Sequence, residues 1–121
     1  MFNRLHMETD MKLTVLDRVL LMNVLPERGK KVFEYRIFND VKRQLSFTDP
    51  ELTELKFKHN EETGETNWNP ESPLSIEGKE FDFEPNTFKL LQDVLKEIED
   101  RGEATIQMVP LYDKFESAVV K

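Results

Sequence analysis

The apolar residues near the start of the chain recur with helical spacing. The pattern predicts a helix that begins after Thr14, because Thr14 can cap the first turn and Asp17, three positions later, completes a capping box. We expect this helix to end near Leu25, since Pro26 follows and cannot continue it. Its second half is apolar almost all round, which is typical of a helix buried on several sides.

One flank of this predicted helix has two interpretations. On a helical wheel, the polar stripe that contains Asp17 and Arg18 continues into Leu21 and Leu25. Either the whole helix is central to the core, or this flank is reserved for another subunit or a partner protein. In the second case the candidate interaction surface contains Leu21, Met22 and Leu25.

Two further helices are predicted before residue 56. Apolar residues recur at every fourth position up to Leu45, which predicts a helix from about Lys31 to Leu45. Its first turn is also rich in strand-forming residues, which leaves an extended start as an alternative. Thr48 is then followed by Asp-Pro-Glu, a combination of cap, early proline and acidic residue that predicts a short helix to about Leu55.

Turn-forming residues and strand formers alternate in the middle of the chain. Residues 56–60 and 65–69 flank a turn that contains Gly64, so we expect a hairpin. Two prolines make residues 69–73 a loop. A further strand segment is predicted over residues 76–83, with a break at its glycine.

Helical spacing returns in the last third of the sequence. A helix is predicted to open at Pro85 and to end at Gly102, a residue that commonly terminates helices. Thr105 can cap a last helical segment, which Pro110 interrupts or restarts. The final element is therefore expected to be short.

Together these elements predict a single-domain α+β fold. N-terminal helices come first, then a small antiparallel sheet or hairpin, then C-terminal helices. The length of 121 residues, 38% of them hydrophobic, fits one core. We expect this domain to cover residues 11–121, and residues 1–10 to form a flexible start because regular patterning begins after them.

The composition removes several kinds of chemistry. The chain contains no cysteine, which excludes disulfides, thiolate zinc sites and cysteine nucleophiles and favours a cytoplasmic location. Its apolar stretches are far shorter than the roughly 20 residues that span a bilayer. The four glycines allow neither a phosphate-binding loop nor a dinucleotide fingerprint. We therefore expect a protein that is not an enzyme and that binds no cofactor.

Metal binding and acid–base catalysis have weak candidates only. His6 and His59 are the two histidines, and neither has a second ligand at a metal-binding spacing. Glu80, Asp82 and Glu84 share one face of a predicted strand, where three carboxylates can hold Mg²⁺ or Ca²⁺. The same alternation predicts an acidic solvent face over a phenylalanine core, which we prefer, so no metal is expected.

The charge distribution bears on nucleic-acid binding. The net charge is −7, and residues 48–100 hold fifteen acidic side chains against five basic ones. A basic stretch from Arg28 to Arg43 and a following helix and hairpin suggest a winged-helix DNA-binding regulator. Acidic residues on that helix and at the hairpin tip argue against it. The acidic segment suggests a different role, an inhibitor that imitates nucleic-acid phosphates and occupies a host protein.

Trp68 is the single tryptophan and stands in the sequence Asn-Trp-Asn-Pro. A tryptophan at such a bend either covers the core or is exposed as an anchor for a partner. We expect the first arrangement and keep Trp68 as a candidate interaction residue for the second.

Several stretches resemble small proteins of unassigned role encoded in bacteriophages and prophages. They are the run from Met11 to Gly29, Leu45-Ser-Phe47, Trp68-Asn-Pro70 and Leu111-Tyr-Asp-Lys-Phe115, and the similarity covers about residues 11–116. These motifs are structural in kind. The resemblance implies a phage origin, with a location in the bacterial cytoplasm or in the virion, and it supplies no catalytic residues.

The function expected from the sequence is that of a non-enzymatic phage accessory or assembly protein. Such a protein acts through contacts with itself or with a protein partner. The acidic mimic is the alternative hypothesis, and the winged-helix regulator is the third.

Overall fold

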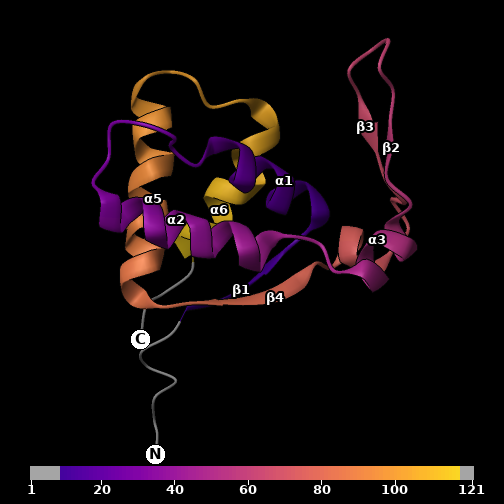
Figure 1. Ribbon diagram of the computed structural model, residues 1–121, viewed down its shortest axis with the longest axis horizontal. Helices are drawn as coiled ribbons and strands as arrows, with labels where there is room; N and C mark the ends of the chain where they lie inside the picture. Colours follow the sequence, from indigo (N-terminus) through magenta and orange to yellow (C-terminus); the bar gives the residue numbers. More distant parts are fainter. Residues whose placement is uncertain (1–8, 118–121) are drawn as a thin grey trace, which may run out of the picture.

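The computed structural model describes residues 9–117, and it confirms the predicted single α+β domain (Figure 1). Helices dominate, and the strands are few and short. The elements in chain order are β1 Thr9–Leu13, α1 Val15–Val24, α2 Val32–Leu45, α3 Asp49–Leu55, β2 Lys58–His59, β3 Thr66–Asn67, α4 Pro73–Ile76, β4 Lys79–Phe83, α5 Pro85–Asp100, the 3₁₀ turn η2 Ile106–Met108 and α6 Val109–Ser117.

Local capping interactions fix the starts of α1 and α3, as the sequence predicts. The Asp17 backbone N–H donates to Thr14 Oγ1 at 3.2 Å, and the Thr14 N–H donates back to Asp17 Oδ2 at 3.0 Å. Thr48 and Glu51 form the same reciprocal pair at the start of α3. The first turn of α2 is helical, so the extended alternative is wrong.

The main sheet pairs strand β1 with strand β4 in antiparallel orientation. Met11 lies opposite Phe81, and Leu13 lies opposite Lys79. The expectation of a flexible start over residues 1–10 is wrong for Thr9 and Asp10, which belong to β1, while residues 1–8 lie outside the described residues. The sequence does not predict β1, because its partner strand β4 is far away in the sequence. The alternation of buried and exposed residues in β1 also covers only a few positions.

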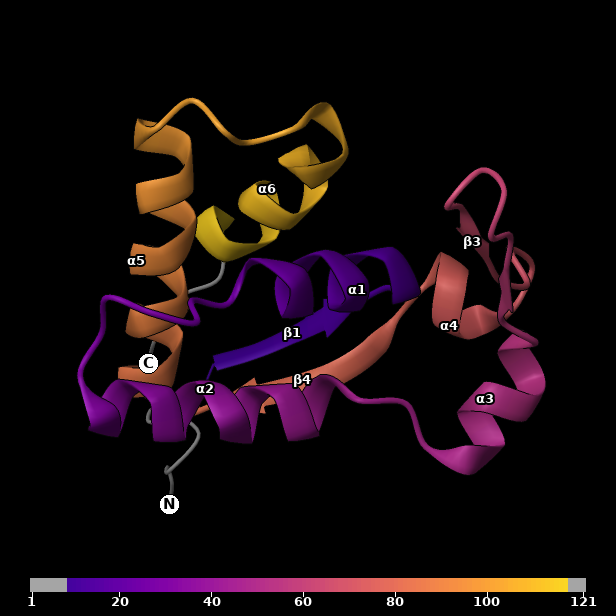
Figure 2. The same ribbon diagram turned by 45° about the horizontal axis from the view of Figure 1, so that its top comes forward.

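Helices surround this two-stranded sheet (Figure 2). α1 and α2 run along it on two sides, α5 stands across one end, and α6 packs beside α5 and α1. Phe88 of α5 and Phe115 of α6 stack with ring centroids 5.2 Å apart. Phe38 of α2 and the inward phenylalanines of β4 complete the same buried cluster. The core is thus built from both ends of the chain.

A separate lobe, formed by α3, β2, β3 and α4 (residues 47–77), extends beyond the other end of the sheet (Figures 1 and 2). The predicted hairpin is present, with strands of two residues each. Two details of the sequence prediction are wrong here. A single helical turn, α4, follows Ser72, which caps it, and Ile76 belongs to this turn rather than to a strand.

Candidate functional site

The charged residues of α1 face inward. Asp17 is 3% exposed and Arg18 is 0% exposed, so the polar stripe of the helix is buried in the protein. Leu21 and Leu25, on the same side, are 0% and 5% exposed. Residues that lie within the core cannot form a contact surface, so assigning Leu21 and Leu25 to an interaction surface is wrong for the folded chain. Met22, the third candidate, is half-buried and packs against the core.

Four hydrogen bonds hold the buried Arg18 guanidinium. Its Nε donates to the Leu45 carbonyl at 3.1 Å, and its Nη2 donates to the Ser46 carbonyl at 2.9 Å. Both terminal nitrogens also reach the Glu51 carboxylate, at 3.2 and 3.4 Å. The Phe47 ring lies 3.9 Å from the Arg18 Cζ, in a cation–π arrangement. Arg18 therefore joins α1 to the end of α2 and to the lobe.

Glu51 is held by three donors. Besides Arg18, Lys79 of β4 approaches its Oε2 at 3.1 Å, and the Thr48 N–H donates to its Oε1 at 2.8 Å. Burial alone would raise the pKa of the Glu51 carboxyl. The hydrogen bonds from Arg18, Thr48 and Lys79 outweigh burial and lower this pKa from 4.5 to about 2. Glu51 is consequently ionised throughout the physiological pH range.

Asp17 makes the corresponding link on the other side of α1. Its carboxylate accepts from the Thr14 N–H at 3.0 Å and pairs with the Lys114 ammonium of α6. Charged contacts thus tie α1 to α6 through Asp17 and to the lobe through Arg18. The rotation of α1 about its axis is fixed by these buried charges.

The opposite face of α1 is apolar. Leu16, Val19, Leu20 and Asn23 follow the i, i+3, i+4, i+7 spacing of one helix face. The first three are half-buried and Asn23 is exposed. The partly exposed apolar flank of α1 therefore contains different residues from those that the sequence suggested for a partner. In the sequence, the exposed flank of α1 can be identified from Asn23, which lies on the side of the helix opposite Asp17 and Arg18.

Exposed apolar residues also occur on the elements beside α1. Ile76 on α4, which contacts α1, is 66% exposed, and Ile106 at the turn before α6 is 86% exposed. Figure 2 shows α4 next to the start of α1 and α6 running alongside it. Ile76 thus places an exposed apolar side chain on an element that contacts α1.

Trp68 packs inside the lobe. Its ring lies 5.8 Å from that of Phe57, which in turn lies 5.0 Å from Phe47, and Trp68 itself is half-buried. The three rings form a small aromatic cluster that ends at Arg18. Trp68 therefore covers this cluster rather than the main core.

The lobe carries most of the net charge of the protein. Residues 47–77 hold eight acidic side chains against two lysines, a formal charge of −6 out of −7. At the hairpin tip, Glu61, Glu62 and Glu65 are all exposed. The lobe extends away from the rest of the domain (Figure 1), so these carboxylates are open to solvent.

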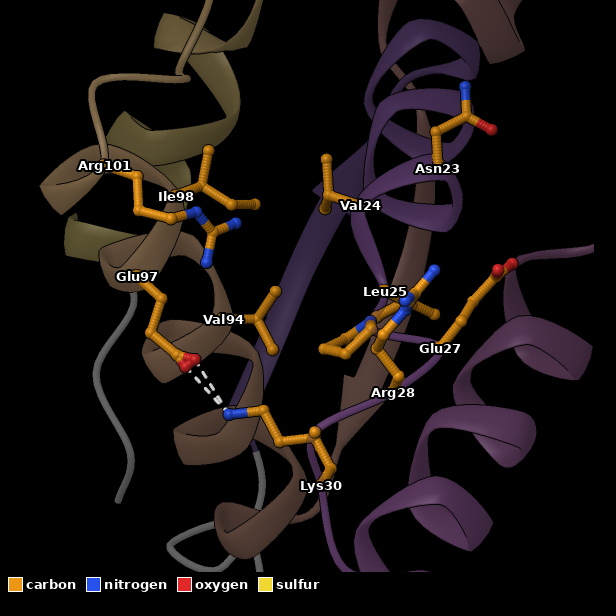
Figure 3. A pocket seen from close by; sticks show the side chains of 12 residues that line it. Asn23, Val24, Leu25, Glu27, Arg28, Lys30, Val94, Glu97, Ile98 and Arg101 are labelled. Carbon is orange, nitrogen blue, oxygen red and sulfur yellow. Dashed lines mark hydrogen bonds and ion pairs between the residues drawn. The ribbon is translucent and has the colours of Figure 1, made fainter.

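A cavity of about 630 Å³ lies between the α1–α2 loop and the last turns of α5 (Figure 3). Leu25, Val94 and Ile98 form its apolar part. Arg28 comes from the loop side and Arg101 from the end of α5. No local sequence pattern indicates this cavity, because its two walls are about 70 residues apart in the chain.

An ion pair closes one side of this cavity. Lys30 Nζ donates to both oxygens of the Glu97 carboxylate at 2.8 Å (Figure 3). This hydrogen bond is the main reason that the pKa of Lys30 is raised. The charges of Lys30 and Glu97 thus compensate each other. The other charged residues of the lining are Arg28, Arg101 and Glu27, and Arg101 pairs with Glu103 outside the lining.

The candidate metal-binding and acid–base side chains that lie among the described residues are exposed. Between residues 9 and 117, no three His, Cys, Asp or Glu side chains come together as ligands for a metal ion. Glu80, Asp82 and Glu84 are exposed, while Phe81 and Phe83 between them are buried, as the alternation predicts. His59 is exposed and contacts Thr66 Oγ1 at 2.9 Å, whereas His6 lies outside the described residues.

None of the helices in the described range combines the length and the apolar character that crossing a bilayer requires. Comparisons of the chain with protein-family models, with curated proteins and with solved structures found no match.

Proposed function

We propose that the protein is a non-enzymatic binding module that acts through protein–protein contacts made by the outward face of α1. The partner is a second copy of the chain or another protein. The observation that carries the proposal is the orientation of α1, whose charged residues are buried while Leu16, Val19 and Leu20 remain partly exposed. The phage accessory or assembly role belongs to the same proposal and depends on the resemblance described above.

The free-energy cost of burying charged residues on α1 supports a functional reason for the orientation of this helix. Burying a charged group costs several kcal/mol before its partners compensate it, and an apolar residue of similar volume is often equally stable. Arg18 and Asp17 nevertheless occupy buried positions, and each has a partner of opposite charge. The buried charges are explained if they set the rotation of α1 about its axis. This rotation directs the apolar face of the helix outward. Apolar faces directed at solvent are typical of interaction sites.

Sedimentation velocity over a range of concentrations tests self-association. We expect the sedimentation coefficient of the wild type to rise with concentration if the partner is a second copy, and Leu16→Asp to abolish the rise. Lys89→Asp, on an exposed position of α5, is the matched control. Circular dichroism verifies that both variants are folded.

A photo-crosslinking amino acid at Asn23 tests for a different partner. Asn23 is exposed at the C-terminal end of the face, so a partner should give one discrete crosslinked product in the bacterial host, and this product should be lost with Leu16→Asp. A concentration-independent monomer that also gives no discrete product would overturn the proposed function.

The acidic mimic is a second candidate, and the projecting lobe with its charge of −6 favours it. A mimic competes with DNA for a basic host protein, and its binding weakens as salt rises. The variant with Glu61, Glu62 and Glu65 changed to glutamine should then no longer compete with DNA for the host protein. A control with Glu99 and Asp100 changed to their amides should still compete with DNA. Equal behaviour of the two variants would reject the mimic.

The winged-helix regulator, the third hypothesis, has little support. α2, α3 and the hairpin follow one another in the required order. However, α3 exposes Asp49 and Glu54, and the hairpin tip is acidic, so both elements would repel phosphate groups. We therefore do not propose DNA binding.

A further inference from the structure

We infer that the cavity between the α1–α2 loop and α5 binds a small amphipathic anion, a carboxylate attached to an aliphatic body. This inference is independent of the protein-binding role of α1. It depends on three features of the cavity, which are its size, its apolar floor and the guanidinium N–H donors of Arg28 and Arg101 that other side chains do not engage.

The size and the floor suit a small molecule. A volume of about 630 Å³ falls in the range of ligand pockets, about 300–1,000 Å³. Leu25, Val94 and Ile98 are buried core residues that also line the cavity, and half-buried Val24 adjoins them. Their apolar surface can receive a hydrocarbon chain, and such contact is favourable because it removes apolar area from water.

The two arginines extend over this floor from opposite walls (Figure 3). Arg101 uses its Nε to bind Glu103 at 3.0 Å, which leaves its terminal nitrogens for another acceptor. Within residues 9–117, no carboxylate is within ion-pairing distance of Arg28. The Glu27 carboxylate, the remaining acid of the cavity lining, lies on the side away from α5 (Figure 3). Guanidinium groups bind carboxylates well because two parallel N–H donors match the two oxygens.

The partial negative charges at the C-terminal ends of α1 and α5 do not explain the presence of both Arg28 and Arg101. α1 ends at Val24 without a basic residue in its last turn, and a helix C-terminus is equivalent to roughly half a negative charge. The end of α5 is closed by backbone N–H groups of Arg101, Gly102 and Glu103. Glu103 pairs with Arg101 through Nε alone, and the end of α1 offsets only part of the Arg28 charge. A carboxylate ligand would accept from the guanidinium N–H groups that these contacts do not use.

The test uses sodium octanoate as the probe in isothermal titration calorimetry with the full chain. We expect one molecule of octanoate to bind per chain. Affinity should rise about fourfold for each methylene group from butanoate to octanoate, since about 0.8 kcal/mol is gained per buried methylene. Octanol, which lacks the charge, and inorganic phosphate, which lacks the chain, should both bind more weakly than octanoate.

Variants connect the binding to this cavity. Arg28→Gln and Arg101→Gln should each weaken octanoate binding about tenfold, which corresponds to about 1.4 kcal/mol. Arg43→Gln is the matched control, because Arg43 is an exposed arginine of α2 outside the cavity. The inference is overturned if octanoate does not bind, if both cavity variants bind it like the wild type, or if phosphate binds as tightly as octanoate. In those cases the arginines only compensate the helix ends.

Discussion

The guanidinium of Arg18 and the carboxylate of Glu51 form an ion pair at 3.2 Å, and the Arg18 side chain is completely buried. The two residues are 33 positions apart in the sequence. Through this pair, α1 is connected to the lobe, and the Lys79 ammonium extends the connection to β4. The pair therefore lies at the junction of the lobe and the sheet, and its charge state affects both.

The first prediction concerns pH. The pKa of Glu51 falls from 4.5 to about 2 on folding, so its contribution to stability is complete above pH 4.5 and is lost as the pH falls towards 2. A shift of this size corresponds to about 3 kcal/mol. Urea unfolding at a series of pH values should show Glu51→Gln less stable than the wild type by this amount at pH 7. The difference should nearly vanish at pH 2.

Glu103→Gln provides the control for this measurement. Glu103 pairs with Arg101 on the surface, where both side chains are more than half exposed, so its removal should cost less than about 1 kcal/mol. Stability curves of Glu51→Gln and wild type that run parallel between pH 7 and pH 2 would contradict the assigned role of Glu51.

The second prediction concerns the lobe. Trp68 is the single tryptophan and packs in the aromatic cluster of the lobe, so its fluorescence reports unfolding there. Far-UV circular dichroism reports mainly the helices outside the lobe. In Glu51→Gln the lobe loses its charged contact with Arg18, and the fluorescence transition should occur at lower urea concentration than the dichroism transition. In the wild type the two transitions should coincide, as expected for one cooperative unit.

A variant on the surface of the lobe gives the comparison. Glu62→Gln changes the same type of residue at the exposed hairpin tip and leaves the Arg18 contact intact. Its two transitions should remain coincident. If the transitions of Glu51→Gln also coincide, the lobe does not depend on this ion pair for its attachment.

The parts of the fold that the sequence predicts are those determined locally. The capping boxes of Thr14 with Asp17 and of Thr48 with Glu51 join residues three positions apart, so both helix starts follow from the sequence. Strand β1 depends on pairing between Leu13 and Lys79 and has only two inward residues of its own to indicate it. No local pattern contains that information.

The same distinction explains the outcome for the candidate site. The sequence identifies α1 as a helix with an apolar flank, but the choice of flank depends on where Arg18 finds partners. Its acceptors belong to Leu45, Ser46 and Glu51, which are 27 to 33 residues away. A charged stripe normally faces solvent, and this expectation fails when distant residues supply the hydrogen-bond acceptors for a buried arginine. The available flank is therefore the opposite one.

The third prediction concerns Gly78, the residue that precedes β4. Its φ of +91° is unfavourable for residues with a side chain, and a Cβ atom there would lie 2.7 Å from the backbone carbonyl group of Leu13. Backbone atoms of a paired strand cannot move away without disturbing the sheet. Gly78→Ala should therefore lower the free energy of unfolding by more than about 2 kcal/mol, measured by urea denaturation.

Gly64 separates the two causes of this loss. It also has a positive φ, +75°, but nothing lies within 4 Å of the position of its Cβ, so Gly64→Ala experiences the backbone strain without the collision. We expect about 1 kcal/mol for this control. The excess loss in Gly78→Ala then measures the close approach of the segment before β4 to the end of β1. Equal losses in the two variants would show that the backbone of Leu13 can yield, and that the junction between β1 and α1 is less rigid than the buried contacts of Asp17 and Arg18 imply.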